Sequence, residues 1–193
     1  MCKKRVRKGK KMPSQERRNE IENIVIKLLE NEPELNKPAF DIVSYLINNE
    51  KFAIASSPMN DGTTGMLFVD DNNKIKGTNV NRLILINSLL KNETDFVQRR
   101  RFIIAHEYGH FLLHKNAETQ FAHRDTKEKD SLIEREADFF ARCLLMPKAT
   151  LLNVLNIELV KNMSIEEKIS FVARVFNVTK KKANDRLLEV NNG

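Results

Sequence analysis

The sequence predicts an α+β fold, with helices towards both ends of the chain and a small sheet between them. Near the start, apolar residues recur at helical spacing, as Ile21, Val25 and Leu28 do. Three short apolar runs follow between residues 52 and 87, separated by stretches rich in turn-forming residues. From residue 96 onward the spacing of apolar residues is helical again.

Two helices are expected before the sheet. Ser14 suits the cap of a helix that continues to about Glu30, and Glu32-Pro33-Glu34 would end it. A second helix is expected from Pro38, which suits a first helical turn, to about Asn49.

The sheet is expected to be small and antiparallel, with three or four strands. Its apolar runs are Phe52–Ala55, Met66–Val69 and Leu83–Asn87. The stretches between them, such as Asn60-Asp61-Gly62 and Asp70–Asn73, supply the residues that favour turns.

Helices are expected again after the sheet. A long helix from about Phe96 to His114 precedes a polar loop from Lys115 to about Asp130, and another helix runs from about Ser131 to Leu145. The remainder predicts three more helices. One of them, Ser164 to Phe176, begins with a capping box formed by Ser164 and Glu167.

Length and composition indicate a soluble globular chain of one domain, or of one domain with a small appendage. Of its 193 residues, 41% are hydrophobic and 31% charged, and no apolar run approaches the ~20 residues that cross a bilayer. Cys2 and Cys143 form no pairing or zinc-knuckle pattern, which favours reduced thiols. Polar residues 12–18 follow the basic start where a signal peptide would be apolar, so a cytoplasmic protein without membrane contact is expected.

The net charge of +7 resides in a basic tail, residues 1–13. Positions 3–11 contain seven Lys and Arg and no acid, so the rest of the chain is formally neutral. Such a tail can hold phosphates without reading sequence, but a solvated, disordered terminus is the simpler interpretation. Nucleic acid is therefore a weakly supported partner.

The segment from His106 to His110 carries the strongest chemical signal. These two histidines lie one turn apart on the same helix face, so each can direct a nitrogen at one metal ion. Zinc accepts imidazole nitrogen and keeps one of its four positions open to water in catalytic sites. Glu107 lies about 100° around the helix. There it flanks the metal and can act as the base for the bound water.

An isolated HExxH pattern can also arise by chance, as two surface histidines on a helix. Here residues 102–105 precede the pattern and residues 111–113 follow it, and all of them are apolar. The helix should therefore be buried, and buried histidines need partners. We expect Zn²⁺ to be that partner.

A catalytic zinc site needs a third protein ligand, which the next helix can supply. With Glu134 at zero on a helical wheel, Ala137, Ala141 and Asp138 fall within about 60° of it, while Glu136 falls at about 200°. The small alanines allow close approach to the motif helix, so Glu134 is the predicted third ligand. Asp138, one turn on, is placed to hydrogen-bond a ligand histidine, and Glu136 is expected to face solvent.

The other histidines fit the site less well. A metzincin would carry its third histidine at position 116, which is Asn116. His114, one turn beyond His110, is either a support behind the ligands or an ordinary structural residue. His123, in the polar loop, is expected at the surface, and Tyr108 points away from the metal face and should pack.

At two blocks, Arg99–His114 and Glu134–Pro147, the chain resembles the ImmA/IrrE metallopeptidase family. The two blocks in this order, separated by a short polar loop, are far more specific than either alone. The likeness is strong over about residues 80–147. A family member commonly carries Asn at position 138, so Asp138 is a conservative departure.

The resemblance implies a zincin-like domain of the gluzincin type, here residues 14–148, with His106, His110 and Glu134 on zinc and Glu107 catalytic. It also implies cytoplasmic, site-specific cleavage of a helix-turn-helix transcriptional repressor, in the regulation of a mobile element or of a stress response. The protein partner would then be that repressor.

The helical C-terminal region, residues 149–193, resembles a helix-turn-helix, which the family also tends to carry. Its charge is weak, with six Lys and Arg against four Asp and Glu over residues 164–190. A role in docking the repressor or in structure is favoured over DNA binding.

Two other functions stay open: a non-proteolytic regulator that binds a repressor or DNA around a structural zinc ion, and a toxin-like peptidase restrained by an antitoxin. Glu107 argues against the first, because a structural site closes its fourth position and has no need of a base. An exposed sheet edge would suit an extended substrate.

Overall fold

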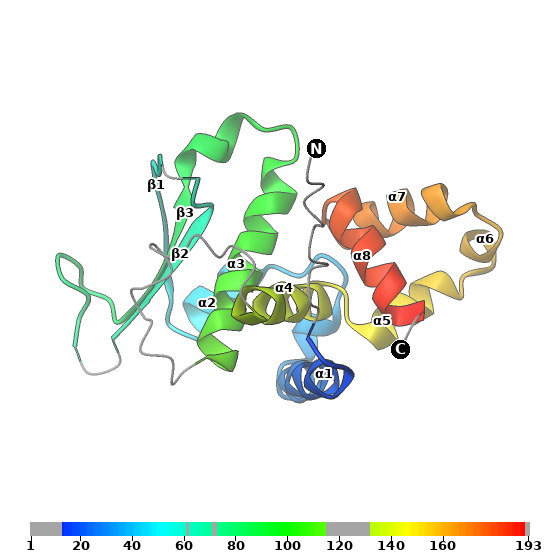
Figure 1. Ribbon diagram of the computed structural model, residues 1–193, viewed down its shortest axis with the longest axis horizontal. Coiled ribbons are helices and arrows are strands. Elements are labelled where there is room, and N and C mark those ends of the chain that lie inside the picture. The colour runs from blue at the N-terminus through cyan, green and yellow to red at the C-terminus, as the bar shows by residue number, and fades with distance from the viewer. Residues whose placement is uncertain (1–12, 61, 71–72, 115–131, 192–193) are drawn as a thin grey trace, which may run out of the picture.

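The computed structural model describes residues 13–60, 62–70, 73–114 and 132–191. The expected basic residues 3–11, Cys2 and His123 lie outside the described residues. As Figure 1 shows, one long helix, α3 (Phe96–Leu113), runs through the centre, with the sheet on one side and the C-terminal helices on the other. The predicted α+β class is confirmed.

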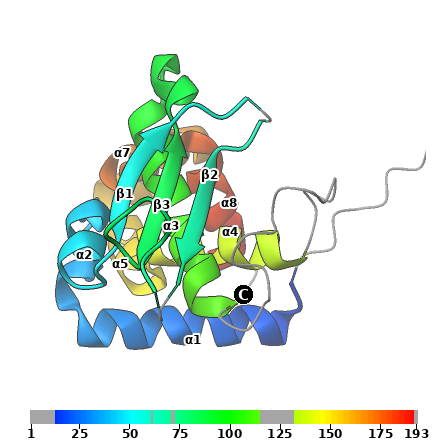
Figure 2. The same ribbon diagram turned by 90° about the vertical axis from the view of Figure 1, so that its left-hand side faces the viewer.

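The sheet has three strands, β1 (Ala53–Ser57), β2 (Gly65–Val69) and β3 (Arg82–Asn87). Their order is β1-β3-β2, with β3 in the middle, as Figure 2 shows. β2 pairs with β3 antiparallel, as expected, but β1 pairs with β3 parallel. The sheet is therefore mixed, and the expectation of a purely antiparallel sheet was wrong.

The mixed topology arises because the chain places β2 at the far edge and then inserts β3 between the first two strands. Ile84 and Ile86 of β3 are fully buried, whereas most residues of β1 and β2 are only partly buried. Leu83 and Leu85, which alternate with Ile84 and Ile86, are only partly buried, so one face of β3 is covered more fully than the other. Apolar spacing alone does not encode strand order, which explains the error.

Two helices precede the sheet. In α1 (Gln15–Asn31) the Ser14 hydroxyl accepts a hydrogen bond from the Arg17 amide, so the predicted cap is confirmed. A 3₁₀ turn, η1 (Pro33–Asn36), follows. The next helix, α2 (Ile42–Asn48), begins later than expected.

The late start of α2 has a local cause. The Asp41 side chain caps the helix by accepting from the Val43 and Ser44 amides. Ala39 has a φ of 56°, which no right-handed helix contains. Pro38 therefore lies in the turn before α2 and not in its first turn.

The motif helix α3 packs against α4 (Leu132–Leu145) at close range. A Cβ atom added to Gly109 would lie 2.9 Å from the Phe140 ring and 3.3 Å from the Ala137 backbone. Ala137 and Ala141 are fully buried, which confirms that small residues let the two helices approach. A short 3₁₀ helix, η2 (Ser88–Asn92), leads from the sheet towards α3.

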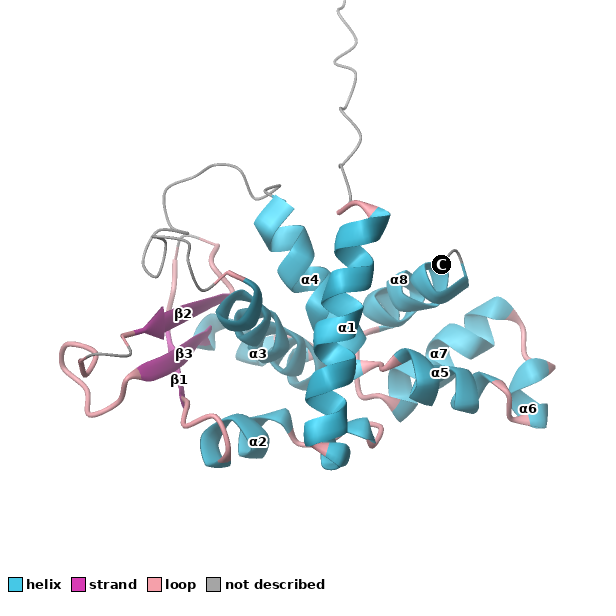
Figure 3. Cartoon of the chain, turned by 90° about the horizontal axis from the view of Figure 1, so that it is seen from below, coloured by secondary structure: helices cyan, strands magenta, loops and turns pink. Residues whose placement is uncertain are grey.

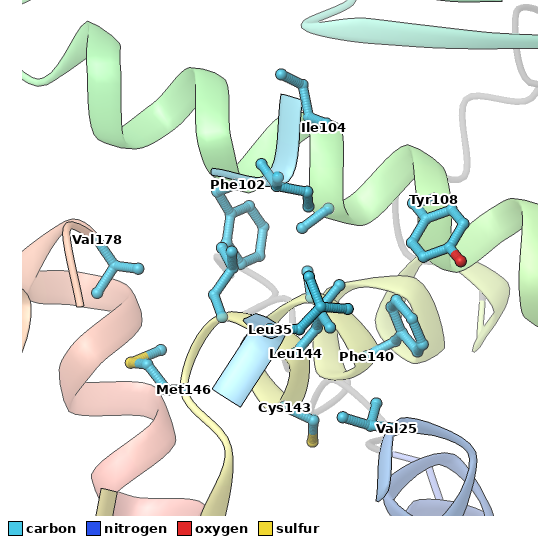
Figure 4. Close-up of a cluster of buried hydrophobic side chains, with 14 of the residues drawn as sticks. Val25, Leu35, Phe102, Ile104, Tyr108, Phe140, Cys143, Leu144, Met146 and Val178 are labelled. Atoms are coloured by element: carbon cyan, nitrogen blue, oxygen red, sulfur yellow. The ribbon is translucent and has the colours of Figure 1, made fainter. Parts of the chain in front are cut away.

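The core fills the space around this helix pair. Figure 4 shows Phe102, Ile104 and Tyr108 of α3 above the α4 side chains Phe140 and Leu144. Because the sheet covers the opposite face, α3 is buried along most of its length. This arrangement fixes the position of the motif residues.

The C-terminal region contains α5 (Lys148–Leu155), α6 (Glu158–Lys161), α7 (Ile165–Val175) and α8 (Lys180–Asn191). The prediction of three helices missed α6, which is only one turn long. The capping box of Ser164 and Glu167 is present. Between α7 and α8, the Val178 amide donates to the Ala173 carbonyl at 2.9 Å, and both side chains are buried.

A buried arginine ties this region to the rest of the molecule. Arg186 of α8 is 1% exposed. Its guanidinium donates to Glu22 of α1 at 2.9 Å and to the Met146 carbonyl at 3.2 Å. In the view from below in Figure 3, α1 is drawn with α4 on one side and α8 on the other.

Candidate metal centre

The two motif histidines meet on the face of α3 that α4 covers. Their Nε2 atoms lie 3.0 Å apart, and their rings are in edge-to-face contact with centroids 4.6 Å apart. The His106 and His110 side chains are 15% and 7% exposed. The expected pairing of the two histidines one helical turn apart is therefore realised.

Glu134 of α4 completes the cluster. Its Oε2 lies 3.2 Å from His106 Nε2, and its Oε1 lies 3.4 Å from His110 Nε2. Donors at the corners of a tetrahedron around zinc, each at 2.0–2.1 Å, would be about 3.3 Å apart. The observed separations of 3.0–3.4 Å match that geometry, so the three residues fit one small cation.

The hydrogen bond between His106 and Asp138 directs the far side of the His106 ring into this space. Asp138 can only accept when ionised, so His106 Nδ1, 3.0 Å from Asp138 Oδ1, carries the proton. His106 Nε2 is then the ring atom that faces the cluster. Two imidazole nitrogens and one carboxylate converge there, and a positive charge between them satisfies the arrangement.

The pKa values of His106 and Glu134 also favour a positive charge in the cluster. Burial disfavours the charged form of His106, but its hydrogen bonds to Asp138 and Glu134 outweigh burial and raise its pKa to about 10. For Glu134, burial is outweighed by the two histidines, which hold its pKa well below its usual range. The metal-free cluster therefore attracts a positive charge, either a proton or a metal ion.

Glu107 lies beside the cluster and is not among the three converging donors. It is 8% exposed. Burial, with a further contribution from the Glu134 carboxylate and opposed by His106, raises the pKa of Glu107 to about 7. A cation in the cluster would favour the ionised form, which is the form that accepts a proton.

Asp138 lies where the wheel placed it, one turn beyond Glu134 and against His106. Its second oxygen, Oδ2, accepts a hydrogen bond at 3.0 Å from Lys182 of α8. Arg142 lies farther away, with its Nη1 3.6 Å from Oδ2. Despite burial, the His106 hydrogen bond and the Lys182 charge keep the pKa of Asp138 well below its usual range.

His114 lies behind the other histidine of the cluster, His110. His114 Nδ1 lies 3.2 Å from His110 Nδ1, and His114 Nε2 lies 3.1 Å from Glu136 Oε2. Arg17 of α1 donates to the same Glu136 oxygen at 2.8 Å. Between the two roles left open for His114, the geometry favours a support behind the ligands.

The expectation that Glu136 faces solvent was wrong, because Glu136 is 7% exposed. The helical wheel correctly placed Glu136 and Glu134 on different faces of α4, but it took into account only the packing of α4 against α3. Helix α1 covers the opposite face of α4 and brings Arg17 to the carboxylate. Burial there is outweighed by Arg17 and His114, which lower the pKa of Glu136.

Tyr108 points away from the cluster, as expected. It is fully buried, and its hydroxyl donates to Glu50 at 2.8 Å. Its ring meets Tyr45 and Phe52 edge-on. Tyr108 therefore packs in the core and is not one of the three residues whose atoms converge.

Three residues near the site, Gly65, Arg17 and Lys182, were not predicted from the sequence. Gly65 opens β2 directly over α3, where an added Cβ atom would lie 2.9 Å from Glu107 Oε1. Arg17 and Lys182 reach the site from α1 and α8, 119 and 44 residues from the carboxylates that they contact. No local pattern marks such distant contacts, although a glycine at the start of an apolar run is a signal of close backbone approach.

Gly65→Ala is expected to reduce catalysis strongly and to destabilise the fold. The added methyl group would clash with Ile103 Cγ2, so either β2 or α3 must shift, and such overpacking costs about 1–3 kcal/mol. The shift would displace the Glu107 carboxylate. Urea unfolding and cleavage rates measure the two effects. Unchanged activity at unchanged stability would contradict the close approach of β2.

The family to which the chain belongs follows from a comparison with models of known families. A family model described as the IrrE N-terminal-like domain of peptidase family M78 matches residues 49–188. The chain belongs to the ImmA/IrrE family. A search of curated proteins found no match. The family match includes β1 to β3, both motif helices and most of the C-terminal region, and it supports a metallopeptidase-type function.

In the part of this ImmA/IrrE protein that the structure describes, no helix is both long enough and apolar enough to span a membrane.

Proposed function

We propose that this protein is a zinc-dependent endopeptidase of the cytoplasm that cleaves a helix-turn-helix transcriptional repressor at a specific site. The observation that carries the proposal is the convergence of His106, His110 and Glu134 beside the buried carboxylate of Glu107. Two imidazoles and one carboxylate form a donor set that zinc peptidases use, and it leaves a fourth position for water.

In this proposal each residue of the site has one task. His106, His110 and Glu134 would hold the zinc ion, which when bound would supply Lewis acidity to a water molecule and to the scissile carbonyl. The Glu107 carboxylate accepts a proton from the attacking water and then donates it to the leaving amine. Asp138 and His114 orient the two histidines through their Nδ1 atoms.

The edge of β2 is the proposed seat for the substrate backbone. In the part of the chain that the structure describes, β2 pairs only with β3. Gly65 at the start of β2 lies over Glu107. An extended peptide that added to β2 as a further strand would run past the catalytic carboxylate. The class of the protein partner rests on family membership, which implies a repressor that regulates a mobile element or a stress response.

The test is co-expression with a small helix-turn-helix protein encoded beside this gene. We expect discrete repressor fragments with the wild-type protein, and none with Glu107→Gln or when a chelator is added to the purified pair. Metal analysis of the purified protein should find zinc at one equivalent.

Two other outcomes would replace this proposal. A stable complex without fragments would indicate a regulator that binds the repressor, with zinc in a structural role. Growth arrest on expression of the wild-type protein alone, relieved by a partner, would indicate a toxin-like peptidase. Cleavage that persists in Glu107→Gln would reject the assignment of the base.

A further inference from the structure

The N-terminal turn of α8 contains three consecutive lysines with different environments. Lys180 and Lys181 are exposed, whereas the Lys182 side chain is 19% exposed. Lysine is unfavourable at a helix N-terminus, where the helix dipole is positive, and the first turn of α8 contains no acid to offset it. Within α8, only Asp185 in the next turn favours the Lys182 charge, and the closer contacts of Lys182 lie outside the helix.

That interaction is with Asp138 on α4. Lys182 Nζ donates to Asp138 Oδ2 at 3.0 Å, and it also lies 3.7 Å from the centroid of the Phe102 ring. The lysine is thus held between a carboxylate on one motif helix and an aromatic face on the other. Both contacts cross from the C-terminal region to the helices that carry the metal cluster.

The Asp138 carboxylate is shared between two tasks. One oxygen, Oδ1, accepts from His106 Nδ1 at 3.0 Å, and the other is held by Lys182. Fixing the second oxygen stops the carboxylate from rotating, so the first stays directed at His106. The orientation of His106 Nε2 towards Glu134 therefore depends on both contacts.

Arg142 is a poor substitute for Lys182. Its Nη1 atom is 3.6 Å from Asp138 Oδ2. Its Nε and Nη2 atoms donate to Glu189 Oε1 at 2.9 and 2.7 Å. Because Arg142 is already engaged with Glu189 on α8, loss of Lys182 would leave Asp138 Oδ2 with the longer Arg142 ion pair in place of the 3.0 Å hydrogen bond.

We propose that Lys182 is a positioning residue of the metal centre, and that α8 thereby completes the site formed by α3 and α4. The inference rests on the proposed function, because it requires His106 to bind the metal. It assigns the C-terminal region a part in the peptidase site itself, beyond the docking or structural role that its sequence suggests.

The experiment compares metal affinity between the wild-type protein and three variants of the full chain, by competition with a chromogenic chelator for Zn²⁺. Lys182→Met keeps the contact with Phe102 and removes the charge. We expect it to weaken zinc binding about 3–10-fold, below the upper range for groups that contact a ligand directly. Lys181→Met, the exposed neighbour, should leave zinc affinity unchanged. Lys182→Arg should recover most of the wild-type affinity.

A double-mutant cycle separates positioning from general stability. Asp138→Asn keeps the size of the side chain and removes the charge that Lys182 holds. If Lys182 acts through Asp138, Lys182→Met should have little further effect on zinc affinity in the Asp138→Asn background. Equal losses in both backgrounds would overturn the proposal, as would a change of less than about twofold from Lys182→Met alone.

Cobalt spectra provide a second readout. With Co²⁺ in place of zinc, Lys182→Met should shift the visible absorption bands, because His106 turns. A merely structural lysine would lower the unfolding temperature without moving the bands. If Lys182→Met folds poorly, Lys182→Gln provides the same comparison. Failure of the wild-type protein to bind Zn²⁺ or Co²⁺ would reject the proposed function instead, so the two failures are distinguishable.

Discussion

Replacing Glu107 with glutamine is expected to abolish peptide cleavage while leaving metal binding and folding nearly intact. The amide has the size of the carboxylate, so the packing beside Gly65 is kept. An amide cannot accept a proton from water at neutral pH, and loss of a general base slows catalysis by on the order of 10²–10⁴-fold. Glu107 is not one of the three converging donors, so zinc content should stay near wild type.

The measurement is the rate of cleavage of a repressor substrate, together with zinc content and urea unfolding for the same preparation. Glu158→Gln is the matched control. It makes the same chemical change on α6, where the side chain is 82% exposed. Wild-type cleavage by Glu107→Gln with its metal retained would exclude Glu107 as the base.

The parts of the site that depend on one helix or on two adjacent helices were predictable from the sequence. His106 and His110 lie on one face because of helical periodicity alone. The choice of Glu134 over Glu136 needed only the angles on α4 and the small residues Ala137 and Ala141. Local features such as the Ser14 cap and the capping box at Ser164 could also be predicted from the sequence.

The parts that depend on long-range contacts were not predictable. Strand order in the sheet follows from which segments pack on α3, and apolar spacing is the same for β1 whether it pairs parallel or antiparallel. The burial of Glu136 comes from α1, through Arg17. The helical wheel of α4 identifies an inward stripe, but it cannot show that a third helix covers the other face.

Glu134→Ala and Glu136→Ala are expected to change different properties, although the two residues are only two positions apart on α4. Glu134→Ala should weaken zinc binding, whereas Glu136→Ala should lower stability. Glu134→Ala removes one of the three proposed metal-binding groups. We expect it to weaken zinc binding by more than roughly 100-fold, the largest loss typical of residues that only support a metal ligand. Zinc at 100 times its dissociation constant stabilises a fold by about 2.7 kcal/mol. The unfolding temperature of wild type should therefore rise on adding zinc, and that of Glu134→Ala should not.

Glu136→Ala should lower stability and retain the metal. The change removes the acceptor shared by Arg17 and His114. We expect a loss of about 1–2 kcal/mol in the free energy of unfolding, because the hydrogen bonds are charge-assisted but the Arg17 side chain is partly exposed and can be solvated. Zinc should still raise the unfolding temperature of this variant.

Thermal unfolding of both variants, with and without added zinc, gives the comparison directly. The two substitutions remove the same atoms from the same helix, so each is the control for the other. A zinc response in Glu134→Ala together with its absence in Glu136→Ala would reverse the ligand assignment. It would then mean that α4 presents its Arg17-paired face to the metal, which the 2.8 Å contact between Arg17 and Glu136 opposes.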